Sequence, residues 1–188
     1  MNTAPAILSG ALRVFEENEN ANLLILSSDH IMTNTEQFKI AVEKGEIDIN
    51  NGKIVLFGVL PSSPETGYGY INVEKIPNIK KLEAEKIIKF IEKPKLKDAK
   101  QFLKDGKFLW NSGIFMFKAS TLIDEMKKYA DQTFQAVKGS YQNKIKDLDF
   151  IRLEKENYQK CENLSIDQAI MEKTDLGIVL PIDKGWSD

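Results

Sequence analysis

Short apolar runs of strand length alternate with segments of helical periodicity along almost the whole chain. The strand-like runs cover residues 22–26, 53–59, 67–73, 87–91, 108–117 and 176–180. Helical patterns separate them, at residues 4–18, from 33 or 34 to about 45, 96–104, 120–129, within 131–160 as one or two surface helices, and from 165 onward. Strands that alternate with helices predict an α/β layer fold with a mostly parallel sheet. No repeat or Pro/Gly-rich linker interrupts the pattern, so we expect one domain over residues 1–188.

The sequence also predicts helix caps, a helix end and the burial of particular residues. Thr3 is a candidate N-cap for the first helix. The run 22–26 is apolar enough to predict a buried strand, and the second helix is expected to place Ile40 inside and to end near Gly45. Ser165 and Gln168 have the spacing of a capping box.

Composition excludes several classes of chemistry. His30 is the only histidine, which rules out multi-histidine metal sites, and Cys161 is the only cysteine, which rules out an internal disulfide. A lone thiol fits a reducing cytosol. The 26 basic and 28 acidic residues give a net charge of −2, which argues against nucleic acid as the main partner. No apolar run has the length of a membrane span and the first residues lack an export signal, so a cytoplasmic protein without a membrane partner is expected.

Polar side chains follow several of the predicted strands, where ligands of such sheets bind. Asp29 comes directly after the run 22–26 and could bind a hard cation such as Mg²⁺, or could cap the next helix. Asp188 is a second loop carboxylate, with a frayed chain end as the alternative. Asp167 lies in the first turn of a predicted helix, where its charge stabilises the helix dipole.

Two glycines alternate with two tyrosines in the run that begins at residue 67. On a strand, Gly67 and Gly69 share one face, and Tyr68 and Tyr70 share the other. Bare backbone on the glycine face would let a bulky ligand approach closely. A bulge, or close packing against a helix, would explain the same pattern.

Two further segments offer groups suited to a phosphorylated sugar. Glu92 could accept hydrogen bonds from two sugar hydroxyls, and Lys93 could pair with a phosphate. Asn111 offers a donor and an acceptor, which suits a hydroxyl group. A surface strand end and a turn beside the core residue Trp110 are the structural alternatives.

Seven short motifs, taken in order, resemble those of the bacterial-type mannose-1-phosphate guanylyltransferases, or GDP-mannose pyrophosphorylases. They are NTAPAI at 2–7, DH at 29–30, ETGYGYI at 65–71, FIEKP at 90–94, WNSGIF at 110–115, SID at 165–167 with AIME at 169–172, and GWSD at 185–188. The resemblance runs through the whole chain. It implies a Rossmann-like, GT-A-like sugar-nucleotidyltransferase fold of three layers with a mixed, mostly parallel sheet. It also implies the reaction of mannose 1-phosphate with GTP to give GDP-mannose and pyrophosphate.

The same resemblance implies roles for the polar residues. Asp29 and Asp188 match the two carboxylates that hold Mg²⁺ against the nucleotide phosphates, and Lys93 matches a cation near those phosphates. These three are the implied catalytic residues. In-line phosphoryl transfer needs positioning and charge neutralisation rather than a covalent nucleophile, which is compatible with the scarcity of His and Cys.

The substrate-binding residues also follow from the resemblance. Gly67 and Tyr68 match the strand that lies along the sugar, Glu92 matches the residue that binds mannose hydroxyls, and Asn111 matches the amide that faces the sugar ring.

The chain also departs from the family pattern. The glycine-rich nucleotide loop of the family lies upstream of the NTAP motif, and a further region follows WSD; neither is present, and Ser27 and Gln168 replace a usual Pro and Tyr. We therefore expect a domain truncated at both ends, inactive alone and completed by a separately encoded N-terminal fragment. A missing central strand also predicts marginal stability. The alternatives are a non-catalytic sugar-nucleotide-binding or regulatory protein, or a related hexose-1-phosphate nucleotidyltransferase.

Overall fold

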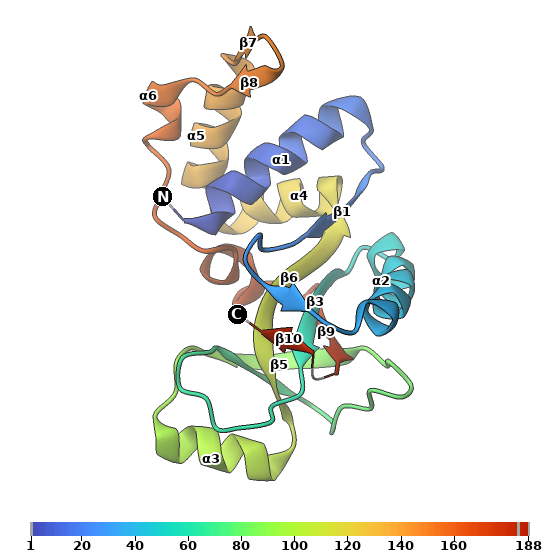
Figure 1. The fold of residues 1–188 in the computed structure, drawn as a ribbon. Helices are drawn as coiled ribbons and strands as arrows, with labels where there is room; N and C mark the ends of the chain where they lie inside the picture. Colours follow the sequence, from blue (N-terminus) through green and yellow to red (C-terminus); the bar gives the residue numbers. More distant parts are fainter. Residues whose placement is uncertain (1, 184, 188) are drawn as a thin grey trace. The chain divides into compact units, whose positions relative to one another are not determined.

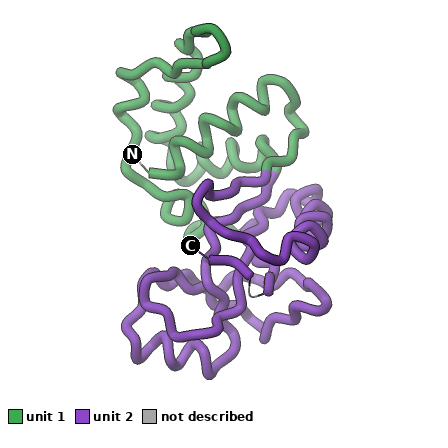
Figure 2. Tube along the Cα trace, viewed as in Figure 1, with its two compact units in different colours: residues 1–23, 118–175 green, residues 24–117, 176–188 purple. Residues whose placement is uncertain are grey.

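The computed structural model describes residues 2–183 and 185–187, which form two compact units (Figure 2). Unit 1 combines the N-terminal residues up to Leu23 with Lys118–Asp175, and unit 2 combines Leu24–Phe117 with the C-terminal residues from Leu176. Both helices and strands are present, as predicted. Among the helices described, none combines the length and apolar character needed to cross a bilayer.

Unit 1 is built around three helices that pack against one another, α1 (Thr3–Glu17), α4 (Ala119–Tyr129) and α5 (Asp131–Gln142) (Figure 1). The side chain of Asn2, rather than Thr3, caps α1, because its Oδ1 accepts a hydrogen bond from the Thr3 N–H at 2.8 Å. Fully buried side chains from these helices include Leu8, Ala11, Leu122, Met126 and Val137.

The rest of unit 1 follows α5. A hairpin of β7 (Ile145–Asp147) and β8 (Phe150–Arg152) leads to the short α6 (Lys155–Tyr158) and then to the π-helix η1 (Asp167–Met171). The prediction of only surface helices in 131–160 was wrong, since it missed the hairpin and the buried face of α5. The capping box is confirmed by reciprocal hydrogen bonds between Ser165 and Gln168.

Unit 2 contains a six-stranded mixed sheet, in the order β1-β6-β3-β9-β5-β4. Its strands are β1 (Asn22–Ile25), β3 (Ile54–Val59), β4 (Tyr70–Val73), β5 (Glu85–Ile91), β6 (Phe108–Lys118) and β9 (Gly177–Ile182). β3 and β9 pair in parallel, whereas β3–β6, β4–β5, β5–β9 and β4–β6 are antiparallel. Because β4 also pairs with β6, five strands form a closed ring and β1 lies outside it, at the end of the sheet.

The position of β1 explains why one burial prediction was wrong. Every residue of β3 is buried, but Leu24 and Ile25 of β1 are only half-buried, and Leu26 just after it is 55% exposed. β3 has a neighbouring strand on each side, whereas β1 is an edge strand of the sheet. The apolar run at 22–26 therefore forms the expected strand without the expected burial.

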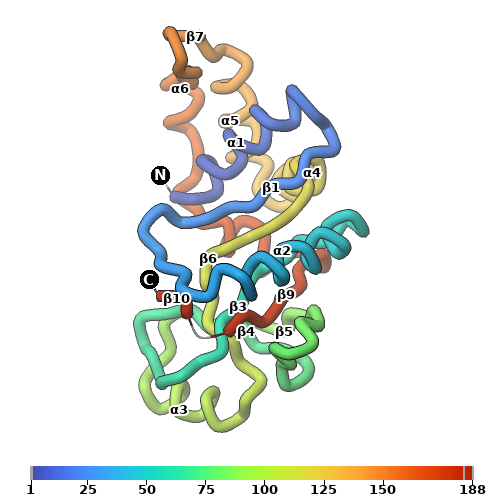
Figure 3. The backbone as a smooth tube through the Cα atoms, turned by 45° about the vertical axis from the view of Figure 1, so that its right-hand side comes forward, coloured from blue at the N-terminus to red at the C-terminus, as the bar shows by residue number. Residues whose placement is uncertain are grey.

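Helix α2 (Thr35–Asn50) packs against β3 and β9 (Figure 3). Asn34 caps it, with Oδ1 accepting from the Gln37 N–H at 3.2 Å. Ile40 is 48% exposed, contrary to expectation, and the helix continues past Gly45. A Cβ at Gly45 would lie 3.3 Å from Leu180 Cδ1, so glycine here allows close packing on the sheet rather than ending the helix. α3 (Leu96–Asp105) extends one residue beyond the predicted range of 96–104 and ends before Gly106, whose φ is 73°.

Candidate functional site

The segment after β1 carries the first predicted site residue. Asp29 lies in an exposed bend, and the next residues form β2 (Ile31–Met32), which pairs antiparallel with β10 (Trp186–Ser187). The register places Ser187 opposite Ile31. Asp188 lies outside the described residues. Among the residues described, no group of three or more His, Cys, Asp or Glu side chains is arranged to hold a metal ion.

Gly185 shapes the approach of the C-terminal segment to this loop. Its carbonyl oxygen accepts a hydrogen bond from the Thr33 N–H at 2.7 Å, and its φ is 148°. A Cβ at this position would lie 2.8 Å from Thr33 Oγ1. The glycine of the GWSD motif is therefore required by local geometry, whatever the chemistry of the residues that follow.

The indole of Trp186 joins the C-terminal strand to the DH motif. Its Nε1–H donates to His30 Nδ1 at 3.1 Å, and the two rings meet edge-on at 5.1 Å. Since Nδ1 accepts, a neutral imidazole here carries its proton on Nε2. Both side chains border a small cavity of about 120 Å³, whose lining is completed by Leu26, Ser27, Met32, Phe38 and Ile114.

Tyr68 connects this corner to β6. Its ring makes edge-on contacts with Trp186, at 5.4 Å between centroids, and with Trp110, at 5.3 Å. Such arrangements are favourable for aromatic pairs. The TGYGY, WNSG and GWSD motifs, which are far apart in the sequence, thus meet through three aromatic rings, and His30 extends the set by one. All four residues belong to unit 2.

Gly69 lies where two predicted sugar-binding residues converge. A Cβ at Gly69 would lie 2.8 Å from Glu92 Oε2 and 3.4 Å from Asn111 Cβ. The Gly69 carbonyl accepts a hydrogen bond from the Asn111 N–H at 2.8 Å. The structure therefore brings the Glu92 carboxylate and the Asn111 side chain together against the backbone of Gly69, where only a residue without a Cβ lets them approach so closely.

The strand prediction for 67–73 needs a correction at its start. β4 begins at Tyr70, and Gly67 and Tyr68 lie in the preceding bend. A Cβ at Gly67 would meet nothing within 4 Å. Tyr70 begins the strand because its backbone pairs with both Ile91 and Trp110 while its phenol O–H donates to the Glu65 carbonyl. Burial raises the pKa of that phenol.

A bulge in β6 positions Asn111. The β3–β6 register shifts between Leu56 and Gly58. The buried Ser112 hydroxyl donates to the Phe57 carbonyl and accepts from the Ile114 N–H at 3.1 Å, and Gly113 adopts a φ of 67°. Asn111 Oδ1 accepts from the Gly113 N–H at 3.0 Å. Bulges often redirect side chains beside binding sites, and this one holds the Asn111 amide in a fixed orientation.

Glu92 and Lys93 follow β5 directly, as predicted. Both are exposed, and within the described part of the chain the Glu92 carboxylate makes no hydrogen bond or ion pair. Lys93 adopts a φ of 43°, which is uncommon for a residue with a Cβ and is found preferentially at functional sites. Pro94, directly after it, is buried.

The structure brings together three of the seven predicted site residues, Tyr68, Glu92 and Asn111. Glu92 and Asn111 converge at Gly69, and Tyr68 contacts Trp110, the neighbour of Asn111. Two contacts were not predicted from the sequence: the hydrogen bond between Trp186 and His30, and the approach of Glu92 to Gly69 rather than to Gly67. The alternation of glycines with tyrosines pointed to Gly69 as a position of close approach. No pattern in the neighbouring sequence predicts the contacts among the aromatic rings.

The chain is similar to known nucleotidyl transferases. The family model described as "Nucleotidyl transferase" matches residues 1–188. The chain is 40% identical over 190 residues to the mannose-1-phosphate guanylyltransferase RfbM of Salmonella typhimurium, covering 100% of this chain and 39% of that protein. The chain spans about two fifths of the length of the curated relatives it matches.

Two solved structures share the fold. One is described as mannose-6-phosphate isomerase from Helicobacter pylori, with a TM-score of 0.85 and 30% identity, covering 100% of this chain and 70% of that one. The other is described as mannose-1-phosphate geranyltransferase from Thermus thermophilus, with a TM-score of 0.82 and 25% identity, covering 99% of this chain and 51% of that one. The predicted mixed α/β fold of the sugar-nucleotidyltransferase type is thereby confirmed.

Proposed function

The chain belongs to the nucleotidyl transferase family, and we propose that it forms the sugar-binding and metal-binding part of a mannose-1-phosphate guanylyltransferase. That enzyme converts mannose 1-phosphate and GTP into GDP-mannose and pyrophosphate. The convergence of Glu92 and Asn111 on the bare backbone of Gly69 is the observation that carries the proposal. Activity is proposed for this chain completed by a further segment that supplies a glycine-rich nucleotide loop.

Recognition of the sugar rests on complementary hydrogen-bonding groups. The Glu92 carboxylate accepts hydrogen bonds from mannose hydroxyls, and the Asn111 amide, oriented by the bulge in β6, faces the sugar ring. Gly67 leaves the backbone near these groups open, since a Cβ there would meet nothing within 4 Å, and Tyr68 is assigned to the same sugar-binding segment. Charge-assisted hydrogen bonds to a carboxylate are stronger than neutral ones, so we assign the larger share of sugar affinity to Glu92.

The phosphates require cationic partners. Asp29 and Asp188 would hold Mg²⁺, since this ion takes oxygen ligands and usually one or two carboxylates together with substrate phosphates. The exposure of Asp29, and the pairing of Ser187 with Ile31, support this assignment because Asp188 is the covalent neighbour of Ser187. A bound Mg²⁺ supplies charge neutralisation at the phosphate oxygens. The Lys93 ammonium provides a second positive charge for the same phosphates.

The transfer itself needs no covalent intermediate on the protein. A phosphate oxygen of mannose 1-phosphate attacks the α-phosphorus of GTP in line. The new oxygen–phosphorus bond forms as the bond from the α-phosphorus to the bridging oxygen breaks, and pyrophosphate leaves with that electron pair. The residues of this chain bind and orient the sugar phosphate and neutralise charge. Both substrates are soluble cytosolic metabolites, so we propose a cytoplasmic location with neither nucleic acid nor membrane as partner.

The assay that tests this function measures pyrophosphate release from GTP, mannose 1-phosphate and Mg²⁺. It is run with the folded chain alone and with a separately expressed segment that carries the nucleotide loop. We expect turnover only in the second case, and a Glu92→Gln variant with strongly reduced turnover. Silence of the folded, completed protein would remove the enzymatic proposal.

A second candidate is a non-catalytic sugar-nucleotide-binding or regulatory protein. It would require only the residues proposed to bind the sugar, which all lie in unit 2. Calorimetry with GDP-mannose separates the two: binding by a completed protein that never turns over supports this candidate. Turnover with glucose 1-phosphate in preference to mannose 1-phosphate would instead indicate a related hexose-1-phosphate nucleotidyltransferase.

A further inference from the structure

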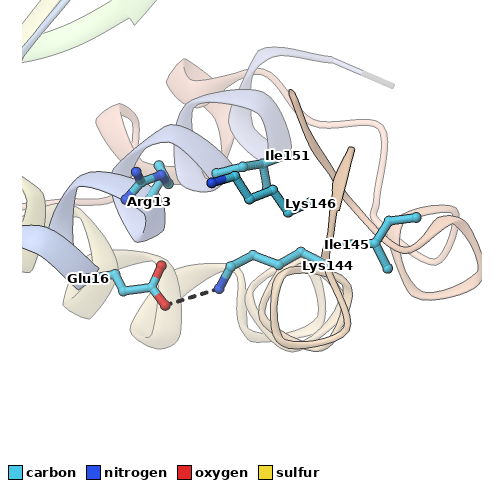
Figure 4. Close-up of a pocket in the computed structure, with 6 residues that line it drawn as sticks. All are labelled: Arg13, Glu16, Lys144, Ile145, Lys146 and Ile151. Atoms are coloured by element: carbon cyan, nitrogen blue, oxygen red, sulfur yellow. Dashed lines mark hydrogen bonds and ion pairs between the residues drawn. The ribbon is translucent and has the colours of Figure 1, made fainter. Parts of the chain in front are cut away.

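Unit 1 contains a hollow that shares no residue with the candidate site. It lies between α1 and the β7–β8 hairpin, has a volume of about 310 Å³, and is lined by Arg13, Glu16, Lys144, Ile145, Lys146 and Ile151 (Figure 4). This volume is at the lower end of the range of small-molecule pockets. A ligand of modest size would therefore fill it.

The charge of the lining differs in sign from that of the whole chain. Three basic side chains and one acidic side chain give the lining a formal charge of 3 − 1 = +2, whereas the chain carries −2. A concave surface with charge of one sign concentrates ligands of the opposite sign. The lining therefore favours an anionic ligand.

The single carboxylate in the hollow is already engaged. Glu16 accepts a hydrogen bond from the Tyr141 hydroxyl and pairs with Lys144 at 3.1 Å, and these two contacts lower its pKa. The Lys144 ammonium also lies 3.9 Å from the centroid of the Tyr141 ring. Glu16 thus holds one cation in place at the side of the hollow.

The other two cations are available to a ligand. Arg13 pairs with Glu17 of its own helix at 2.5 Å, but their side chains are 40% and 64% exposed, and such surface pairs contribute little. Lys146 makes no hydrogen bond or ion pair with any residue that the structure describes. Figure 4 shows its amine directed toward Arg13 across the hollow.

We propose that this hollow binds a small phosphomonoester. A guanidinium fork and two ammonium groups match the oxygens of a phosphate. The hollow is larger than a bare phosphate requires, and Ile145 and Ile151 provide apolar surface for the organic group. The site is additional to the one assigned to catalysis, and its occupancy does not depend on that assignment.

Nuclear magnetic resonance of the ¹⁵N-labelled chain tests the proposal, with inorganic phosphate and phenyl phosphate as probes at constant ionic strength. We expect saturable shifts of the amides of 13–17 and 144–152, with phenyl phosphate binding more tightly. The double variant Arg13→Gln, Lys146→Gln should raise Kd by about tenfold or more, because it removes two charge-assisted hydrogen bonds to the phosphate.

Two controls complete the experiment. Lys127→Gln, which removes a cation of unit 1 that pairs with Asp124, should leave binding unchanged, and so should Glu92→Gln in the candidate site. Each variant's own spectrum reports whether it is folded. Absence of saturable shifts, equal binding of the two probes, unchanged binding by the folded double variant, or loss of binding in Glu92→Gln would each overturn the proposal.

Discussion

Trp186 donates a hydrogen bond from its indole nitrogen to Nδ1 of His30, with 3.1 Å between the two atoms. The residues are 156 positions apart, and the bond lies beside the β2–β10 pairing. Trp186 is 8% exposed, so its N–H needs an internal acceptor. The bond therefore keeps the C-terminal strand next to the loop that contains Asp29.

A double-mutant cycle measures this contact. Trp186→Phe keeps an aromatic ring and removes the donor, and His30→Ala removes the acceptor. We expect each to destabilise unit 2, with a coupling free energy of about 1 kcal/mol in urea unfolding. Strictly additive effects would contradict the contact.

Gly69→Ala should disturb the candidate site without unfolding the chain. The new Cβ would lie 2.8 Å from Glu92 Oε2. Glu92 is exposed and can move, so stability should be nearly unchanged while the carboxylate leaves its position. We expect the Kd for mannose 1-phosphate to rise about tenfold, as for loss of one charge-assisted hydrogen bond. Gly10→Ala, at an exposed helix position with nothing within 4 Å of the new Cβ, is the matched control and should bind normally.

The backbone of Lys93 gives a test of local strain. At φ 43°, glycine is preferred over any residue with a Cβ, so Lys93→Gly should be more stable than Lys93→Ala by about 1 kcal/mol. At Lys104, within α3, the order should reverse by a similar amount, because alanine favours helices. Chemical denaturation of the four variants checks both signs. If Lys93→Ala proves the more stable of its pair, the strained conformation is contradicted.

Glu16 should make the stability of unit 1 depend on pH. The Tyr141 hydroxyl and then Lys144 lower its pKa below the usual 4.5, so the folded state holds its proton less tightly than the unfolded state. Its contribution is therefore present above pH 4.5 and is lost as the pH falls through the lowered folded-state value. Urea unfolding of Glu16→Gln should lack this part of the acid destabilisation. Glu19→Gln, on the exposed turn after α1, should retain it.

Much of the fold was predictable because the apolar periodicity is strong. The strands at 54–59 and 177–182, and the Ser165–Gln168 capping box, follow from local pattern and cap chemistry. The exposure of Ile40 and the half-burial of β1 could not be predicted from the local pattern, because burial depends on which element covers a residue. Helix α2 continues through Gly45 because close packing on Leu180 favours glycine there.

Only part of the candidate site, likewise, was predictable from the sequence. Glu92 was predictable as a chemically suitable group directly after a strand, Asn111 as a suitable amide within the run 108–117, and Gly69 from the alternation with tyrosine. The contact of Tyr68 with Trp110 and Trp186 was not, since it joins segments separated by long stretches of chain. The bulge that orients Asn111 depends on a hydrogen bond from Ser112 to Phe57, which no local pattern reveals.

We propose that the surface around Gly69, Glu92 and Asn111 binds a sugar phosphate. The chain's two tryptophans, Trp110 and Trp186, both contact Tyr68 beside that surface, so intrinsic fluorescence reports on it.

A fluorescence titration of the folded chain with mannose 1-phosphate and Mg²⁺ is therefore the most direct measurement. We expect a saturable change whose midpoint moves about tenfold higher in Glu92→Gln. No saturable change through millimolar ligand, or the same midpoint in Glu92→Gln as in the parent chain, would contradict the account.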